Sequence, residues 1–293
     1  MTANGLLVLD KPFGLSSRQA LDRVRRLYQT QKAGFAGTLD PRATGVLVCA
    51  LGTATRLLTY LETDTKRYEA SVELGQETDT DDAEGQAIAF GDSSAVTRDQ
   101  VEGALAAFRG PICQRPPAYS AISMGGHRLY AMARRGEAVM APEREVTVYA
   151  LTLTTWQPPQ FTLDIHCSKG TYIRALARDL GRRLGCYAYL AGLRRTVSGT
   201  FTLERARTLE MLAATDYALL PSFLLPLRAA VAELPAAVLS PEEAARIRSG
   251  QPIHRAMPGD GPVVLLDGAD AVVAIGRCLS GVIQPEKVLP PVT

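Results

Sequence analysis

The strand-like segments of this chain are irregularly spaced, and this spacing restricts the fold more than any other feature of the sequence. Runs of strand length that are apolar or alternating occur at 5–12, 45–51, 66–74, 146–155, 161–167 and about 186–202. Helical periodicity appears at 16–28, where Ser16 or Ser17 is the expected cap, and at 97–108 and 171–185. Because strands and helices do not alternate regularly, the pattern predicts a mixed α+β fold and not a βαβ repeat.

Two regions depart from this pattern. Composition shifts around 232–250, where Ser240-Pro241 is typical of a helix start and the short strands VVLLDG and AVVAIGRCL follow. We therefore predict a large domain at 1–235 and a small β-rich module at 236–293. Within the large domain, about 111–145 is predicted to be an insertion with a short basic helix near 128–135. Long insertions in compact domains tend to be functional.

Composition excludes several classes of protein. The five cysteines are scattered and form no C-x-x-C pair, and the three histidines are isolated, so we expect neither a disulfide framework nor a metal site. No apolar run approaches the roughly 20 residues of a membrane helix, and the N-terminus does not match a signal peptide. We expect a cytoplasmic protein.

Charge is strongly segregated although the net charge is only +2. Residues 1–61 carry eight Lys or Arg against three Asp or Glu, 62–92 carry two against ten, and 167–207 carry nine against two. The acidic stretch 77–85 has little to bury and predicts a solvated loop. Any one charged run is usually only a solvated face. Two separate basic segments favour a polyanionic partner if the fold brings them together.

Three short segments are ambiguous when they are taken one at a time. In GFAGTLDPRATGVL (34–47), Asp40 followed by Pro41 is typical of a turn, because the side chain caps the backbone and proline presets φ. Arg174 lies just inside the start of a predicted helix, where such an arginine is usually a salt-bridge partner. Tyr68 lies near the start of a predicted strand, where such a tyrosine is usually a core aromatic.

Together these segments resemble the bacterial TruB family of tRNA pseudouridine synthases, which modify uridine 55 of the T-arm. The resemblance covers nearly the whole chain in the family's order. It runs through LLVLDKPFGLSS, GTLDPRATGVL, TKRYEASVELG, PPAYSAI, HRLYAMARRGE, CSKGTYIRALARDLG and LRRTVSGTF. It implies the pseudouridine synthase mixed sheet with flanking helices, a thumb-like insertion and a PUA-like RNA-binding module at the C-terminus.

The resemblance also implies the chemistry. The enzyme would cleave the glycosidic bond of a uridine, turn the base and rejoin it through C5, with no cofactor and no metal. Asp40 matches the essential aspartate, Arg174 its cationic partner, and Tyr68 the tyrosine that stacks on the target base. Asp40 could attack C1′, add to the uracil ring or remove a ribose proton, and the sequence does not choose among these steps. A Pro-fixed turn suits a catalytic carboxylate, so the turn interpretation and the catalytic one are compatible.

Further residues are expected to contact the substrate, a tRNA T-arm stem-loop bound by a monomer. Leu193 matches the apolar residue that closes the pocket. The family usually has His-Thr where this chain has Phe35-Ala36, and phenylalanine can stack but cannot donate a hydrogen bond. Flipping a base out of a folded loop costs a few kcal/mol, which phosphate contacts must offset. The candidates for those contacts are Lys32, Arg128, Arg134, Arg135, Arg182, Arg183, Arg194 and Arg195.

Two alternatives stay open on the sequence alone. The same isomerisation could act on a different structured RNA. The chain could instead be an RNA-binding or RNA-folding protein that depends on its basic surfaces and C-terminal module. The presence of both Asp40 and Arg174 argues against pure binding, because binding alone would not need them together.

Overall fold

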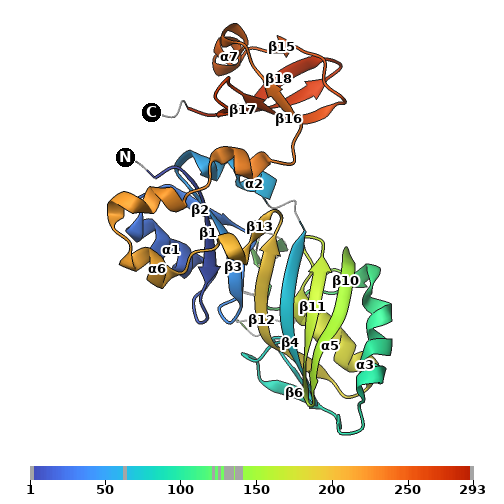
Figure 1. The fold of residues 1–293 in the computed structure, drawn as a ribbon. Coiled ribbons are helices and arrows are strands. Elements are labelled where there is room, and N and C mark those ends of the chain that lie inside the picture. Colours follow the sequence, from blue (N-terminus) through green and yellow to red (C-terminus); the bar gives the residue numbers. More distant parts are fainter. Residues whose placement is uncertain are drawn as a thin grey trace.

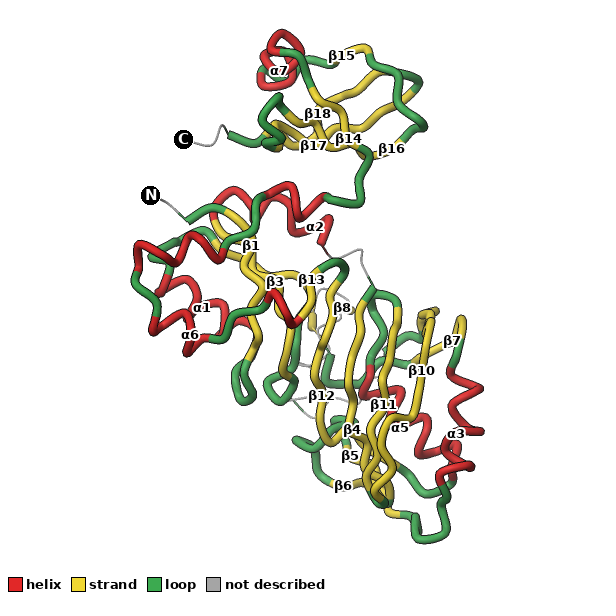
Figure 2. Tube along the Cα trace, in the orientation of Figure 1, coloured by secondary structure: helices red, strands yellow, loops and turns green. Residues whose placement is uncertain are grey.

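The chain forms a large mixed domain and a smaller β-rich module (Figure 1). The structure is a computed structural model that describes residues 3–61, 65–120, 123–124, 127–128, 135 and 141–290. The predicted α+β class is confirmed, because a nine-stranded sheet carries helices that pack beside it (Figure 2).

The large sheet is almost entirely antiparallel. Its only parallel pairing among the strands of the described residues joins Arg194 to Thr44 and Arg195 to Gly45. The strand order is β1 (Gly5–Lys11), β3 (Thr44–Leu51), β12 (Ala188–Ser198), β4 (Lys66–Leu74), β11 (Gln160–Cys167), β10 (Arg144–Gln157) and β7 (Gly110–Gln114), with β2 (Ala33–Ala36) on β3 and β13 (Phe201–Thr202) on β12. Two hairpins, β5 (Gln76–Thr78) with β6 (Ala87–Phe90) and β8 (Ser123–Met124) with β9 (His127–Arg128), lie outside it.

Helices form where the sequence supplies caps and an apolar face. Ser16 caps the first helix in a capping box with Gln19, and Thr97 does the same for α3 with Gln100. The helices of the large domain are α1 (Ser17–Leu27), α2 (Leu58–Leu61), α3 (Arg98–Leu105), α5 (Ile173–Leu184) and α6 (Leu209–Ala214), with short 3₁₀ segments η1 (Gly52–Leu57), η2 (Ala106–Phe108), η3 (Leu203–Arg205), η4 (Tyr217–Phe223) and η5 (Leu227–Val231).

Two of the apolar clusters lie at opposite ends of the large domain. At one end, Leu21 and Val24 of α1 pack on Leu47 of β3 and Phe35 of β2. At the other end, α5 and α3 pack on β4, β10 and β11 through residues such as Leu176, which is buried. The sheet between these two helical ends is the part of the fold that positions the candidate site (Figure 1).

The acidic stretch is not the solvated loop that the sequence predicts. Glu77, Asp81 and Asp82 are all less than 9% exposed. Each meets an arginine of α5, and three arginines spaced by four residues make one row on a helix face. The pairs are Glu77 with Arg182 at 2.5 Å, Asp81 with Arg178 at 2.7 Å, and Asp82 with Arg174 at 3.3 Å. Burial of the acids is tolerated because each is paired with an opposite charge.

The predicted insertion is shorter than 111–145. Its first residues form β7, which pairs with β10 from Gln114↔Arg144 to Gly110↔Val148, so both ends belong to the large sheet. The predicted basic helix near 128–135 falls mostly outside the described residues. His127 and Arg128 form β9, and residue 135 is in a turn.

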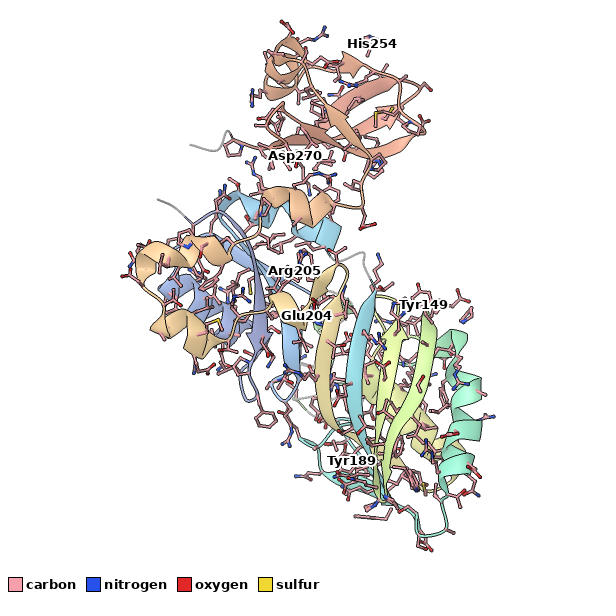
Figure 3. The ribbon with its side chains drawn as sticks, in the orientation of Figure 1. Tyr149, Tyr189, Glu204, Arg205, His254 and Asp270 are labelled. Carbon is pink, nitrogen blue, oxygen red and sulfur yellow. The ribbon has the colours of Figure 1, made fainter. Side chains whose placement is uncertain are left out.

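The C-terminal module has its own five-stranded sheet and is docked on the large domain. Figure 3 places His254 on the side away from the large sheet and Asp270 on the side that faces it. Leu266 and Leu289 belong to the same apolar cluster as Leu57 of η1. The strands run in the order β14 (Ala236–Val238), β16 (Gly261–Leu266), β17 (Val272–Leu279), β18 (Val282–Val288) and β15 (Ile253–His254), with α7 (Pro241–Arg248) capped by Ser240.

Candidate active site

Asp40 lies at the start of a tight turn that the neighbouring helix holds in place. The amide N–H of Ala43 donates to the Asp40 carbonyl at 3.1 Å, which closes the turn that Pro41 favours. The Ser17 hydroxyl accepts from the Leu39 amide at 2.8 Å and donates to the Leu39 carbonyl at 2.9 Å. Because the first residue of α1 binds both backbone groups of the residue before Asp40, the carboxylate stands on a rigid support.

Two glycines allow the chain to pass close to a buried arginine beside the Asp40 turn. Gly37 and Gly45 have φ values of +68° and +99°, which side chains rarely adopt. A Cβ at Gly45 would overlap the backbone of Arg195. The positive φ values and the close approach to Arg195 explain why glycine occupies positions 37 and 45, on either side of Asp40 in the sequence.

The Asp40 carboxylate forms an ion pair with Arg174, 3.1 Å from Nε to Oδ2. The arginine side chain is 8% exposed and that of Asp40 is 44% exposed, so the carboxylate is the member of the pair that faces solvent. Arg174 also lies 3.3 Å from Asp82 and donates to the carbonyls of Thr80 at 3.1 Å and Tyr119 at 3.0 Å. Four partners fix the guanidinium, and with it the position of Asp40.

Burial raises the pKa of Asp40 above its ordinary value of 3.8, and the nearby Asp82 acts in the same direction. Arg174 and Lys11 oppose the shift because a cation favours the ionised carboxyl. The carboxylate is thus less well stabilised than one in water, which is a property that suits a reactive group.

Tyr68 projects from β4 into the same region and is 8% exposed. Burial raises the pKa of its hydroxyl, while a hydrogen bond with Arg195 opposes the rise. Arg195 is 1% exposed and donates to the carbonyls of Val46 at 2.7 Å and Gly37 at 2.8 Å. The guanidinium of Arg195 is therefore used inside the protein, and the expectation that it contacts phosphate stays a prediction.

One cleft of about 660 Å³ collects the predicted pocket residues. It is lined by Phe35, Asp40, Tyr68, Arg174 and Leu193, together with residues of the turn before α5. These five residues come from β2, the following turn, β4, α5 and β12, so the fold brings together side chains that are far apart in sequence. The roles proposed for them from the resemblance stay predictions.

A second cavity of similar size lies on the opposite face of the same strands. Its volume is about 670 Å³, and it is lined by Arg67, Asp164 and several threonines. Arg67 precedes Tyr68, and successive side chains of a strand point to opposite faces. Within this cavity, Arg67 forms an ion pair with Asp164 at 2.5 Å.

Sequence reasoning missed two polar residues beneath the site. Lys11 is fully buried, and its Nζ donates to the carbonyls of Leu15 at 2.6 Å, Pro12 at 2.9 Å and Pro41 at 3.3 Å. Burial lowers its pKa to about 8. Asp82 orients Arg174. The only sequence signals were a lysine at the end of an apolar strand, and an acidic run together with three arginines spaced by four residues in a later helix.

The predicted phosphate contacts are dispersed. Lys32 is exposed just before β2, and Arg183 is exposed on α5. Arg182 and Arg194 are paired with Glu77 at 2.5 Å and Asp10 at 2.7 Å, which reduces their availability. Arg135 is exposed, whereas Arg134 and the side chain of Arg128 lie outside the described residues.

Among the described residues, no three His, Cys, Asp or Glu side chains are grouped so that they could hold a metal ion. Within the same residues, no helix is long and apolar enough to cross a membrane.

Comparison with known proteins decides the family. Residues 25–173 match the TruB family pseudouridylate synthase N-terminal domain, 174–232 the tRNA pseudouridylate synthase B C-terminal domain, and 235–289 the pseudouridine synthase II TruB C-terminal domain. The chain belongs to the TruB family. A tRNA pseudouridine synthase B of Azoarcus sp. strain BH72 is 43% identical over 98% of this chain and 95% of the relative. That of Yersinia enterocolitica is 42% identical over 98% and 91%.

Solved structures agree on the fold. A chain of an H/ACA ribonucleoprotein bound to a substrate RNA containing 2′-deoxyuridine superposes with a TM-score of 0.76 at 23% identity, covering 99% of this chain and 86% of the other. A chain of a Cbf5-Nop10-Gar1 complex gives 0.75 at 26% identity, covering 99% and 86%. The predicted family and the pseudouridine synthase fold are therefore confirmed for this TruB protein.

Proposed function

We propose that this protein isomerises uridine 55 in the T-arm of tRNA to pseudouridine, with Asp40 as the catalytic carboxylate. The observation that carries the proposal is the Asp40–Arg174 ion pair, 3.1 Å long, at a cleft large enough for a nucleotide. Family membership supports the reaction, and the relatives named tRNA pseudouridine synthase B support tRNA as the substrate class.

The reaction depends on an ionised group that is held in a fixed position, and it does not depend on a redox cofactor. The bond from C1′ to uracil N1 breaks and a bond from C1′ to C5 forms, while the C5 hydrogen leaves to solvent and N1 gains one. The balance is redox-neutral. An ionised Asp40 can attack C1′, add to the ring or remove a ribose proton, and each route uses a carboxylate held at the cleft as Arg174 holds this one.

The remaining cleft residues fit a flipped base. Tyr68 and Phe35 offer aromatic faces for stacking, and Leu193 offers an apolar contact at the same cleft. Stacking on such surfaces offsets part of the few kcal/mol that unstacking a base costs. We further propose that the protein acts as a monomer in the cytoplasm and that the C-terminal module contributes to RNA binding.

Tritium release from tRNA labelled at uracil C5 tests the proposal. Only isomerisation frees that hydrogen, so we expect one equivalent released per tRNA and none from a tRNA in which uridine 55 is replaced by cytidine. Release from the replaced tRNA would move the target to another uridine. Binding without any release would favour the RNA-binding alternative.

A further inference from the structure

The exposed face of α1 forms a basic cleft that the proposed reaction does not use. This cleft has a volume of about 460 Å³ and is lined by Arg18, Asp22, Arg25, Arg26 and the segment after the helix. Three arginines against one aspartate give the helix part of the lining a net charge of +2. Arg18 and Arg26 are about 12 Å apart along the helix at 1.5 Å per residue.

Two of the three arginines of this cleft have partners within the protein before any ligand binds. Arg25 donates to Asp22 Oδ1 at 3.1 Å and to Gln31 Oε1 at 3.1 Å, which fixes its guanidinium plane. Arg18 lies 3.4 Å from the other oxygen of Asp22 and is 66% exposed. The Nε of Arg25 is buried and has no hydrogen-bond partner among the described residues, a cost that a nearby anion would offset.

The helix that carries this cleft also supports the candidate active site. The buried face of α1 packs with Phe35, and Phe35 lines the catalytic cleft. Ser17, the neighbour of Arg18, binds both backbone groups of Leu39, the residue before Asp40. The inner side of the helix therefore supports Phe35 and the turn that carries Asp40, and its outer side carries the arginines.

From this placement we infer that the α1 cleft binds backbone phosphates of the substrate RNA, on the strand that flanks the flipped nucleotide. The inference rests on the proposed function. Arginine forks match phosphate geometry, and exposed cations that are spread along a helix can meet more than one phosphate. Asp22 has two effects here: it orients Arg18 and Arg25, and it repels the ligand.

Removal of positive charge and removal of negative charge from the cleft should change tRNA affinity in opposite directions. In the double variant Arg18→Gln/Arg26→Gln, both residues are exposed, so we expect a folded protein with tRNA affinity weaker by about tenfold and a salt slope of log K smaller by about 1 per lost arginine. Asp22→Asn should bind tRNA a few-fold more tightly, because the asparagine Oδ1 can still accept from Arg25 while the one repulsive charge is removed. In tritium-release assays, both the double variant and Asp22→Asn should change KM more than kcat.

Arg98→Gln is the matched control. Arg98 also forms an exposed i,i+4 pair with an acid, Glu102 at 2.8 Å, but on α3. It should leave affinity and salt slope unchanged. Equal behaviour of the α1 double variant and this control overturns the inference, as does weaker binding by Asp22→Asn. Tritium release by the wild-type protein is measured in parallel. It tests the proposed function separately, so failure of the inference is distinct from failure of the proposed function.

Discussion

At the scale of single residues, the reactive carboxylate is the exposed member of a pair whose cation is buried. Arg174 has three partners besides Asp40, so its position does not depend on Asp40. Arg195 borders the same cleft, but its guanidinium binds the carbonyls of Val46 and Gly37 inside the protein. Sequence alone assigned both arginines to function, because a charge count does not show which guanidinium is already occupied by backbone carbonyls.

The pKa of Asp40 predicts the acid limb of the pH profile. A raised pKa means that the carboxyl takes up its proton at a higher pH than free aspartate does. Single-turnover tritium release should therefore fall on acidification with a midpoint above 3.8, the ordinary value. A rate that stays constant down to that value would show that the ionised Asp40 does not limit the reaction.

Phe35 replaces the histidine that is usual at its position in the family. It lines the cleft and packs against α1, so it already supplies an apolar face. We expect Phe35→His to keep turnover within about tenfold, or roughly 1.4 kcal/mol of barrier. Steady-state tritium release measures this, and loss of activity in a folded variant would give Phe35 a specialised role.

At the scale of elements, the row of acid–arginine pairs between α5 and residues 77–82 determines the geometry of the site. Local patterns predicted most helices and strands, because caps, apolar alternation and turn residues act over a few positions. They missed this row, since Asp81 is 97 residues from Arg178. They also placed most of β7 in the insertion, because its partners on β10 lie 30 to 38 residues further along the chain. Burial of an acid depends on such distant partners, which no local composition reveals.

Breaking the middle pair should destabilise the fold. Arg178 is 9% exposed and Asp81 8%, and burial raises the pKa of Asp81 to about 6. Arg178→Gln leaves a buried carboxyl without its cation, so we expect a loss of about 3–5 kcal/mol in unfolding free energy. Adding Asp81→Asn should recover part of it. Arg98→Gln, at an exposed pair, should cost less than about 1 kcal/mol. Urea denaturation measures all three, and equal losses at both sites would contradict a structural role for the row.

At the scale of the whole molecule, the C-terminal module is joined to the large domain by more than a linker. The Lys287 Nζ donates to Thr59 Oγ1 at 2.9 Å and to the Arg56 carbonyl at 3.2 Å, while Arg56 donates to the Val288 carbonyl at 2.6 Å. An apolar cluster spans the contact. Residues 236–293 hold five Lys or Arg against six Asp or Glu. The RNA binding that we propose for this module therefore cannot depend on its net charge.

Removal of residues 236–293 should therefore affect stability as well as binding. It uncovers the apolar side chains that Leu266 and Leu289 cover, so we expect a lower Tm for the remaining domain than for the intact chain. We also expect weaker tRNA affinity with slow isomerisation retained at high enzyme concentration. Calorimetry and filter binding test the two parts. An unchanged Tm with unchanged affinity would show that the module does neither.

The most direct test of the central claim is tritium release by Asp40→Asn. Asparagine also favours the first position of a turn, so the turn closed by Ala43 should persist and the protein should fold and retain tRNA on a filter. The account predicts a loss of several orders of magnitude, each factor of ten being about 1.4 kcal/mol of barrier. Near-normal release from the folded variant would contradict it.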